Sequence, residues 1–80
     1  MAKVKIYGKE SCGYCQQAKM YFGGLDVELD YEEVSEEKIA ELVKETGIDT
    51  VPQIYIDGKF IGGWITTKGL IESGKLDKLL

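Results

Sequence analysis

The spacing of apolar residues changes along the chain, and each spacing predicts one kind of element. Residues 4–7 form a short apolar run typical of a β-strand, and the run ends at Gly8. Between residues 15 and 22 the apolar side chains recur on one helical face, and the pair Gly23-Gly24 ends this segment. Apolar and acidic residues then alternate from 27 to 31, which indicates a half-buried strand.

The second half of the chain shows the same change of spacing. Ser35 is an expected helix N-cap, since two glutamates follow it in the first turn, and the helical spacing continues to Gly47. Two apolar runs, 54–56 and 60–61, then flank the turn pair Asp57-Gly58. This arrangement is typical of a β-hairpin.

A last short helix is expected from Thr66 or Thr67 to Gly74. Three leucines are expected to pack the tail: Leu76, Leu79 and Leu80. The order of elements is then β-α-β-α-β-β-α, in which helices join the early strands in parallel and the late hairpin is antiparallel. We therefore expect one α/β domain over residues 1–80, with a four-stranded mixed sheet and helices on both faces, as in the compact thioredoxin-like fold.

Composition limits the classes of partner. The net charge is −4 and charges of both signs are interspersed without a basic stripe, so nucleic acid is not an expected partner. The N-terminus lacks the apolar core of a signal peptide, and no apolar stretch could span a bilayer. We therefore expect a cytoplasmic protein without a membrane partner. We also expect it to be a monomer. In that compartment a pair of cysteines is more often catalytic or metal-binding than a structural disulfide.

Both cysteines of the chain lie within residues 11–15, beside the expected junction between the first strand and the first helix. Unpaired backbone N–H groups at a helix start favour an anion, and the thiolate of Cys12 would be that anion. Cys15 lies one helical turn further, on the same face but deeper. This placement predicts thiol–disulfide exchange in which Cys12 is the nucleophile and Cys15 is the resolving cysteine.

Purely structural or metal-binding roles for the two cysteines are less favoured by the sequence. Two buried apolar thiols are not expected at this spacing at a helix start. A structural zinc site needs four ligands, whereas the chain offers two cysteines and no histidine, so a metal centre would need a second chain or external ligands. Pro52, the only proline, precedes an apolar strand, where a proline is permitted and by itself indicates no function.

Three motifs together make the chain resemble the glutaredoxins. They are residues 7–15, the segment Thr50-Val51-Pro52 and the segment Ile61-Gly62-Gly63, which occur in the order and spacing of that family. The resemblance covers essentially the whole chain. It implies the thioredoxin fold and a glutathione-dependent oxidoreductase that reduces protein disulfides and glutathione mixed disulfides, here through Cys12 and Cys15.

The resemblance also implies a groove for glutathione. In it Pro52 is cis and lies against the cysteines, while Val51 offers its backbone N–H and C=O to the ligand like an added strand. Gly63 and the amides after it match the family's cradle for the γ-glutamyl carboxylate at a helix start. The residues expected to bind glutathione or substrate are Lys9, Tyr14, Thr50, Val51, Pro52, Gln53, Gly63, Trp64, Ile65 and Thr66.

Two departures from the family pattern affect the expected binding of glutathione. Asp49 stands where many members carry an arginine for the glycine carboxylate, so Lys9 and Gln53 would have to compensate. Ile65 and Thr66 stand near the place of an acid that pairs with the ligand's α-amino group. These positions slightly favour an alternative, a redoxin of the same shape that thioredoxin reductase reduces and that serves ribonucleotide reductase.

A third departure is Gly13, which replaces the proline that many members have between the two cysteines. The resemblance implies that members with small residues here sometimes assemble a [2Fe-2S] cluster between two subunits, with Cys12 of each subunit and glutathione as ligands. A cluster carrier is therefore the second alternative. A non-catalytic interaction domain is disfavoured by the intact cysteine pair.

Overall fold

Four strands form a single mixed sheet in a computed structural model that describes all 80 residues of the chain. The strand order is β2-β1-β3-β4. β1 (Lys3–Gly8) is parallel to β2 (Glu28–Glu33), whereas β3 (Gln53–Ile56) is antiparallel to both β1 and β4 (Lys59–Gly62). The predicted mixed sheet and the predicted hairpin are both confirmed.

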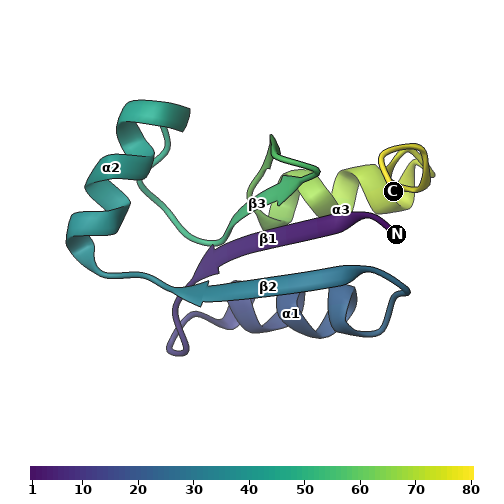
Figure 1. Cartoon of the computed structure of the whole chain (residues 1–80), viewed down its shortest axis with the longest axis horizontal. Coiled ribbons are helices and arrows are strands. Elements are labelled where there is room, and N and C mark those ends of the chain that lie inside the picture. The colour runs from purple at the N-terminus through teal and green to yellow at the C-terminus, as the bar shows by residue number, and fades with distance from the viewer.

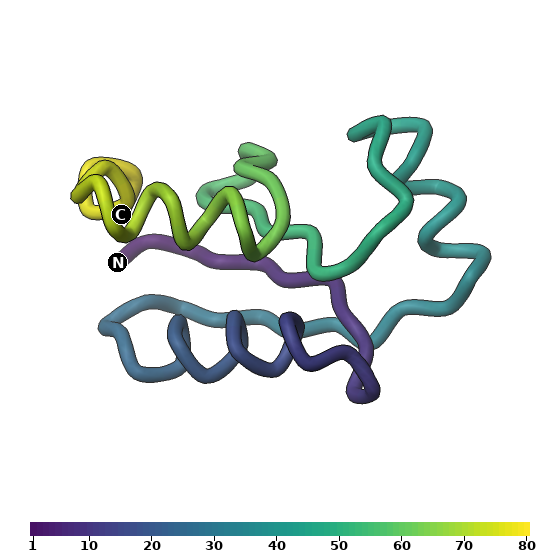
Figure 2. The backbone as a smooth tube through the Cα atoms, turned by 180° about the vertical axis from the view of Figure 1, so that it is seen from behind, coloured from purple at the N-terminus to yellow at the C-terminus, as the bar shows by residue number.

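Two helices cover one face of this sheet. α1 (Gly13–Gly23) and α3 (Trp64–Glu72) lie on the same face of the sheet, toward the viewer in Figure 2, with β1 running between them. No helix here combines the length and the apolarity that a bilayer span needs. Alternate residues of the strands point toward the two helices and form the main core with them. The buried residues of this core are Val4, Ile6, Ala18, Phe22, Ile54, Ile56, Trp64 and Leu76.

The remaining helix, α2 (Glu36–Thr46), meets the opposite face near the carboxyl end of β1. Gln53 and Ile54 are neighbours on β3 and therefore point to opposite faces. Ile54 lies in the main core, whereas Gln53 accepts a hydrogen bond on Oε1 from Thr46 Oγ1 of α2 at 3.0 Å. In Figure 1, α2 extends beyond the ends of β1 and β2, so most of this second face carries no helix.

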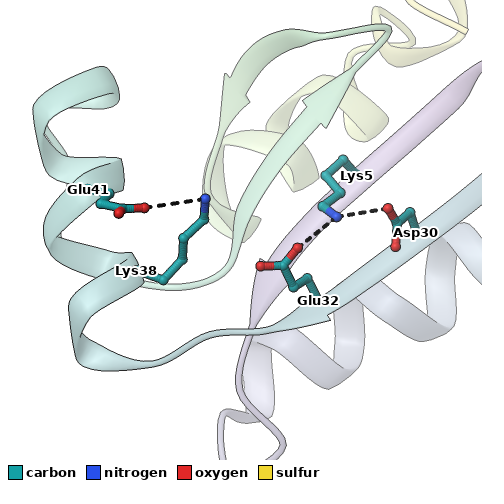
Figure 3. A network of polar contacts seen from close by, with 5 residues as sticks. All are labelled: Lys5, Asp30, Glu32, Lys38 and Glu41. Carbon is teal, nitrogen blue, oxygen red and sulfur yellow. Dashed lines mark hydrogen bonds and ion pairs between the residues drawn. The ribbon is translucent and has the colours of Figure 1, made fainter.

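Charged side chains occupy the face that is free of helices (Figure 3). Lys5 Nζ lies 2.8 Å from Asp30 Oδ2 and 3.0 Å from Glu32 Oε1, across the β1–β2 pair. The hydrogen bond to Asp30 is the main reason that the pKa of Lys5 is raised. This pairing explains the alternation in β2, because one face of the strand packs against α1 and the other carries paired charges.

The capping and turn residues follow the sequence prediction. Ser35 Oγ accepts a hydrogen bond from the backbone N–H of Lys38 at 3.2 Å, and Gly47 ends α2 with a φ of 76°. In the hairpin, Asp57 and Gly58 have φ values of 51° and 83°. Two successive residues with positive φ are what a type I′ turn requires.

The last helix begins earlier than expected. α3 starts at Trp64 with Gly63 as its N-cap, so the predicted start at Thr66 or Thr67 was wrong. The reason is Gly62, whose φ of 122° favours glycine and turns the chain from β4 directly into the helix. Thr67 lies inside the first turn, where its Oγ1 donates to the Gly63 carbonyl at 2.9 Å.

The C-terminal tail also differs from its prediction. Leu76 is buried in the main core, but Leu79 and Leu80 remain 36% and 37% exposed. The tail forms one turn of 3₁₀ helix over Leu76–Lys78. Leu76 is the residue of this turn that points into the main core. The expected packing therefore holds for one leucine of the three.

Candidate active site

Cys12 is the N-cap of α1, at the point where the chain leaves β1. Its backbone is extended, with φ −94° and ψ 115°, and its N–H donates to the Lys9 carbonyl at 3.1 Å. Its Sγ accepts a hydrogen bond from the backbone N–H of Cys15 at 3.3 Å. The sulfur thus occupies the place of an N-cap oxygen, where the helix start favours negative charge.

Cys15 lies one turn further, and its side chain is fully buried. Burial is the main reason that the pKa of the Cys15 thiol is raised to about 12, and the neighbouring Cys12 sulfur adds to it. Hydrogen bonds from the Lys9 backbone and from Tyr31 lower this pKa in part. Both thiols are free, and Cys12 is half-buried. The site therefore pairs an accessible sulfur with an enclosed one.

The loop before β3 brings Val51 and Pro52 to the cysteines. The Val51–Pro52 peptide bond is cis, as the family resemblance implied, and Pro52 is buried. The Cys12 thiol donates to the Val51 carbonyl oxygen at 3.7 Å. Residues far apart in the sequence meet here because β3 pairs with β1.

A groove of about 330 Å³ opens beside this loop and the start of α1. Seven of the ten predicted binding residues line it: Tyr14, Thr50, Val51, Pro52, Gly63, Trp64 and Ile65. A second depression, of about 310 Å³, lies around Lys5 on the charged face of the sheet. Val51, which accepts the hydrogen bond of the Cys12 thiol, lines the first groove and not this depression. The groove beside Val51 is therefore the one that can present a ligand to Cys12.

Gln53 was expected to bind the ligand, but the structure places it outside the residues that line the groove. Its side chain is fully buried between the sheet and α2. Its Nε2 donates to the Ile48 carbonyl at 2.6 Å and to the Thr50 carbonyl at 3.2 Å. The amide therefore joins the end of α2 to the loop that carries Pro52, and every polar atom of the buried side chain has a partner.

Lys9 and Thr66 are likewise absent from the residues that line the groove. Lys9 Nζ lies 2.7 Å from Glu36 Oε1, and this contact is the main reason that the pKa of Lys9 is raised. Thr66 is exposed, and its side chain lies against Gly62. No Asp, Glu, Lys, Arg or His side chain lines the groove, and Asp49, which precedes Thr50 in the chain, is exposed.

The start of α3 offers backbone donors to the groove. Gly63 caps the helix without a side-chain hydrogen bond, so no side chain occupies the N–H groups of the first turn. Such groups favour a carboxylate. The groove therefore combines largely apolar walls, a backbone site for an anion and the Cys12 sulfur near one edge.

Sequence reasoning missed the contacts that hold this site in place. Trp64 is buried, and its Nε1 donates to Gln17 Oε1 at 2.9 Å, which ties α3 to α1. A further set of side chains encloses Cys15. The Tyr31 side chain lies beside it next to Gly8, and Gln16 Nε2 donates to the Tyr31 hydroxyl. No local pattern marks them, because they meet only when β2 pairs with β1.

Comparisons with known proteins agree with the geometry. The family model described as Glutaredoxin matches residues 4–61, which include both cysteines and the proline loop. The chain is 40% identical over 82 residues to glutaredoxin 3 of Escherichia coli strain K12, and the match covers 100% of this chain and 99% of that protein.

Solved structures of the same class superimpose on the chain. A buckwheat glutaredoxin–glutathione complex matches with a TM-score of 0.86 and 33% identity, over 96% of this chain and 74% of that one. A dithiolic glutaredoxin of Trypanosoma brucei brucei matches with a TM-score of 0.82 and 29% identity, over 95% and 84%. With its thioredoxin-like sheet and its Cys12/Cys15 spacing, the chain belongs to the glutaredoxin family of thiol–disulfide oxidoreductases.

Proposed function

We propose that this chain is a glutathione-dependent dithiol oxidoreductase that reduces protein disulfides and glutathione mixed disulfides. The observation that carries the proposal is the unequal environment of the two thiols. Cys12 is half-buried at the helix start, whereas Cys15 is enclosed and the pKa of its thiol is raised to about 12. Cys12 is therefore placed to meet a substrate disulfide first.

The proposed cycle begins when the Cys12 thiolate attacks a substrate disulfide. A bond forms between Cys12 Sγ and one substrate sulfur, and the other substrate sulfur leaves as a thiolate that takes a proton from water. Cys15 then loses its proton and attacks Cys12 Sγ. The Cys12–Cys15 disulfide forms and the remaining substrate sulfur leaves, so the substrate gains the two electrons that the two cysteines lose.

Glutathione restores the dithiol in two further exchanges. One glutathione thiolate attacks Cys12 Sγ, which releases Cys15 and leaves Cys12 glutathionylated. A second glutathione thiolate attacks the glutathione sulfur of this intermediate, which forms glutathione disulfide and releases the Cys12 thiolate. The two glutathione molecules thus lose the two electrons that the two cysteines regain. Removal of glutathione from a glutathionylated protein needs Cys12 alone: the Cys12 thiolate attacks the glutathione sulfur, the protein sulfur leaves as a thiolate, and a further glutathione thiolate then releases Cys12 as glutathione disulfide forms.

The groove supports glutathione as the ligand in these steps. The Val51 backbone lies beside Cys12, and the start of α3 offers N–H groups for a carboxylate. The buckwheat relative was solved in complex with glutathione. The groove has no ionised lining residue for the other charges of the tripeptide, so we expect weaker binding than a site with full charge pairing would give.

The test is a glutathione-coupled reduction assay with a protein disulfide and a glutathionylated peptide as separate substrates. We expect Cys12→Ser to lose both activities, because the nucleophile is gone. We expect Cys15→Ser to lose protein-disulfide reduction and to keep deglutathionylation. Circular dichroism of each variant controls for folding, and full turnover by the folded Cys12→Ser protein would contradict the assigned roles.

A second candidate is a redoxin reduced by thioredoxin reductase that serves a reductase such as ribonucleotide reductase. The uncharged groove and the exposed acid at Asp49 favour it, since both weaken the pairing expected for glutathione. Comparing glutathione with thioredoxin reductase as electron donor, on one protein substrate, separates the two functions. Faster turnover with the reductase would support this second function.

A cluster carrier is a third candidate, favoured by the open space around Gly13, where an added Cβ would meet no atom within 4 Å. The chain contains no group of three or more metal-ligating side chains, so one subunit does not fit a [2Fe-2S] cluster by itself. Cys12 of two subunits and two glutathione thiolates would have to hold it. Anaerobic reconstitution that yields neither a visible chromophore nor a dimer would remove this candidate.

A further inference from the structure

The hydroxyl of Tyr31 lies in the same small space as the sulfur of Cys15. Tyr31 belongs to β2 and points toward α1, where its hydroxyl and the Cys15 sulfur both adjoin Gly8. A Cβ added at Gly8 would lie 2.6 Å from Tyr31 Oη and 3.0 Å from Cys15 Sγ. The space between β1, β2 and α1 is therefore filled by the hydroxyl and the sulfur, and it exists because residue 8 has no side chain.

Gln16 determines how this hydroxyl can point. Gln16 Nε2 donates to Tyr31 Oη at 3.4 Å and to the Lys9 carbonyl at 3.2 Å. A phenol has one hydrogen to donate, and its oxygen can accept from another group at the same time. Because the amide of Gln16 donates to the oxygen, the hydroxyl hydrogen of Tyr31 is available to the Cys15 sulfur.

We propose that Tyr31 is a further residue of the reaction centre, whose hydroxyl donates a hydrogen bond to Cys15 Sγ and stabilises the thiolate with which Cys15 attacks Cys12. The inference rests on the proposed dithiol function and adds a donor for its second step. In that step the Cys15 thiol gives its proton to water, the Cys15–Cys12 bond forms, and the bond from Cys12 to the substrate sulfur breaks. The leaving sulfur carries away the electron pair of the broken bond.

The chemistry of a buried thiol explains why such a donor matters. Burial raises the pKa of Cys15 to about 12, while the attacking species must be the thiolate. Tyr31 is itself held protonated, because burial and the nearby Cys15 and Glu33 raise its pKa to about 12. Its hydroxyl therefore remains a donor at neutral pH. The exposed ammonium of Lys19 lies 4.8 Å from the centre of the Tyr31 ring, and Cys12 is the remaining titratable neighbour that raises the pKa of Tyr31.

The two cysteine steps can be timed separately with an aromatic disulfide. Reduced protein is mixed in a stopped-flow instrument with 5,5′-dithiobis(2-nitrobenzoate), and the coloured thiolate is followed. Attack by Cys12 releases the first thiolate, and attack by Cys15 on the mixed disulfide releases the second. We expect Tyr31→Phe to slow the second phase about three- to tenfold and to leave the first phase unchanged.

Three control proteins make this result specific. Tyr55→Phe removes the exposed hydroxyl of another half-buried tyrosine of the sheet, which donates to Glu45 Oε2 at 3.4 Å, and should change neither phase. Gln16→Ala removes the group that orients Tyr31 and should slow the second phase alone, which keeps the proposal testable if Tyr31→Phe folds poorly. Cys15→Ser should release one thiolate only, and Tyr31→Phe in that background should not change its rate.

The outcomes separate this inference from the function on which it rests. A wild-type protein that releases only one thiolate would overturn the dithiol mechanism itself. Two phases in the wild type, with equal slowing of both phases in Tyr31→Phe, would assign the ring a packing role and overturn the inference. Two phases that are both unchanged in Tyr31→Phe and Gln16→Ala would overturn it as well.

Discussion

At the residue scale, the enclosure of Cys15 depends on Gly8, because a residue with a side chain would not fit there. Gly8 ends β1 with ordinary backbone angles, so its requirement for glycine comes from space and not from φ. An added Cβ would meet Tyr31 Oη at 2.6 Å and both the Cβ and Sγ of Cys15 at 3.0 Å. The 2.6 Å distance is shorter than real Cβ contacts and the 3.0 Å distances are unusually tight, so the neighbours would have to move.

Gly8→Ala should therefore lower the free energy of unfolding by about 1–3 kcal/mol, the usual effect of overfilling a packed site. Urea denaturation of the reduced protein measures this. Gly69→Ala is the matched control, since a Cβ there meets nothing within 4 Å and the residue lies inside α3. This control should raise the unfolding free energy by about 0.5–1 kcal/mol. Equal effects of the two substitutions would contradict the packing argument.

At the scale of elements, the active-site loop is held by a buried amide and not only by the sheet. Gln53 bonds the carbonyls of Ile48 and Thr50 and the hydroxyl of Thr46, so α2, the following loop and β3 share one side chain. The segment Thr50–Pro52 lines the groove directly after these contacts. The position of α2 therefore affects the shape of the groove although α2 lies outside it.

Gln53→Ala should lower the unfolding free energy by about 2–3 kcal/mol, because buried partners of the amide are left without a hydrogen bond. Tyr55→Phe, two positions along β3, is the control and should change it by less than about 0.5 kcal/mol, since its hydroxyl bond is exposed. Urea denaturation compares the variants. A Gln53→Ala protein of unchanged stability that binds glutathione less tightly would restore Gln53 as a ligand residue.

At the scale of the whole molecule, burial of Cys15 links stability to pH. The folded protein keeps the Cys15 proton up to about pH 12, whereas a cysteine in the unfolded chain releases it near pH 9.0. The folded state therefore binds more protons above pH 9, and stability that is complete below pH 9 is lost as pH rises toward 12. Tyr31, also raised to about 12, and Lys5, raised from 10.5, act with the same sign at higher pH.

The reduced protein should therefore lose stability above pH 9, with a slope from Cys15 that approaches about 1.4 kcal/mol per pH unit. Urea denaturation at pH 8, 9 and 10 under reducing conditions measures the slope. Cys15→Ala lacks the group and should show a smaller decline over the same range, as should the oxidised protein. Parallel curves for the wild type and Cys15→Ala would disprove the linkage.

The family followed from the resemblance of three motifs. Sequence patterns predicted the order of the elements, the Ser35 cap, the Asp57-Gly58 turn and the placement of Cys12 at a helix start. These features depend on periodicity or on residues close together in the chain, so local physical chemistry is sufficient to predict them.

Which side chains lie around the active site became clear only once the strands and helices were assembled. Gln53 turned inward to bond α2, Lys9 paired with Glu36, and Tyr31 met Cys15. Each of these contacts joins elements that are distant in the chain, and a residue type alone does not determine which partner a polar side chain finds. The order in which strands pair brings the partners together, and in a dry interior every polar group must then be satisfied by whichever neighbours that pairing supplies.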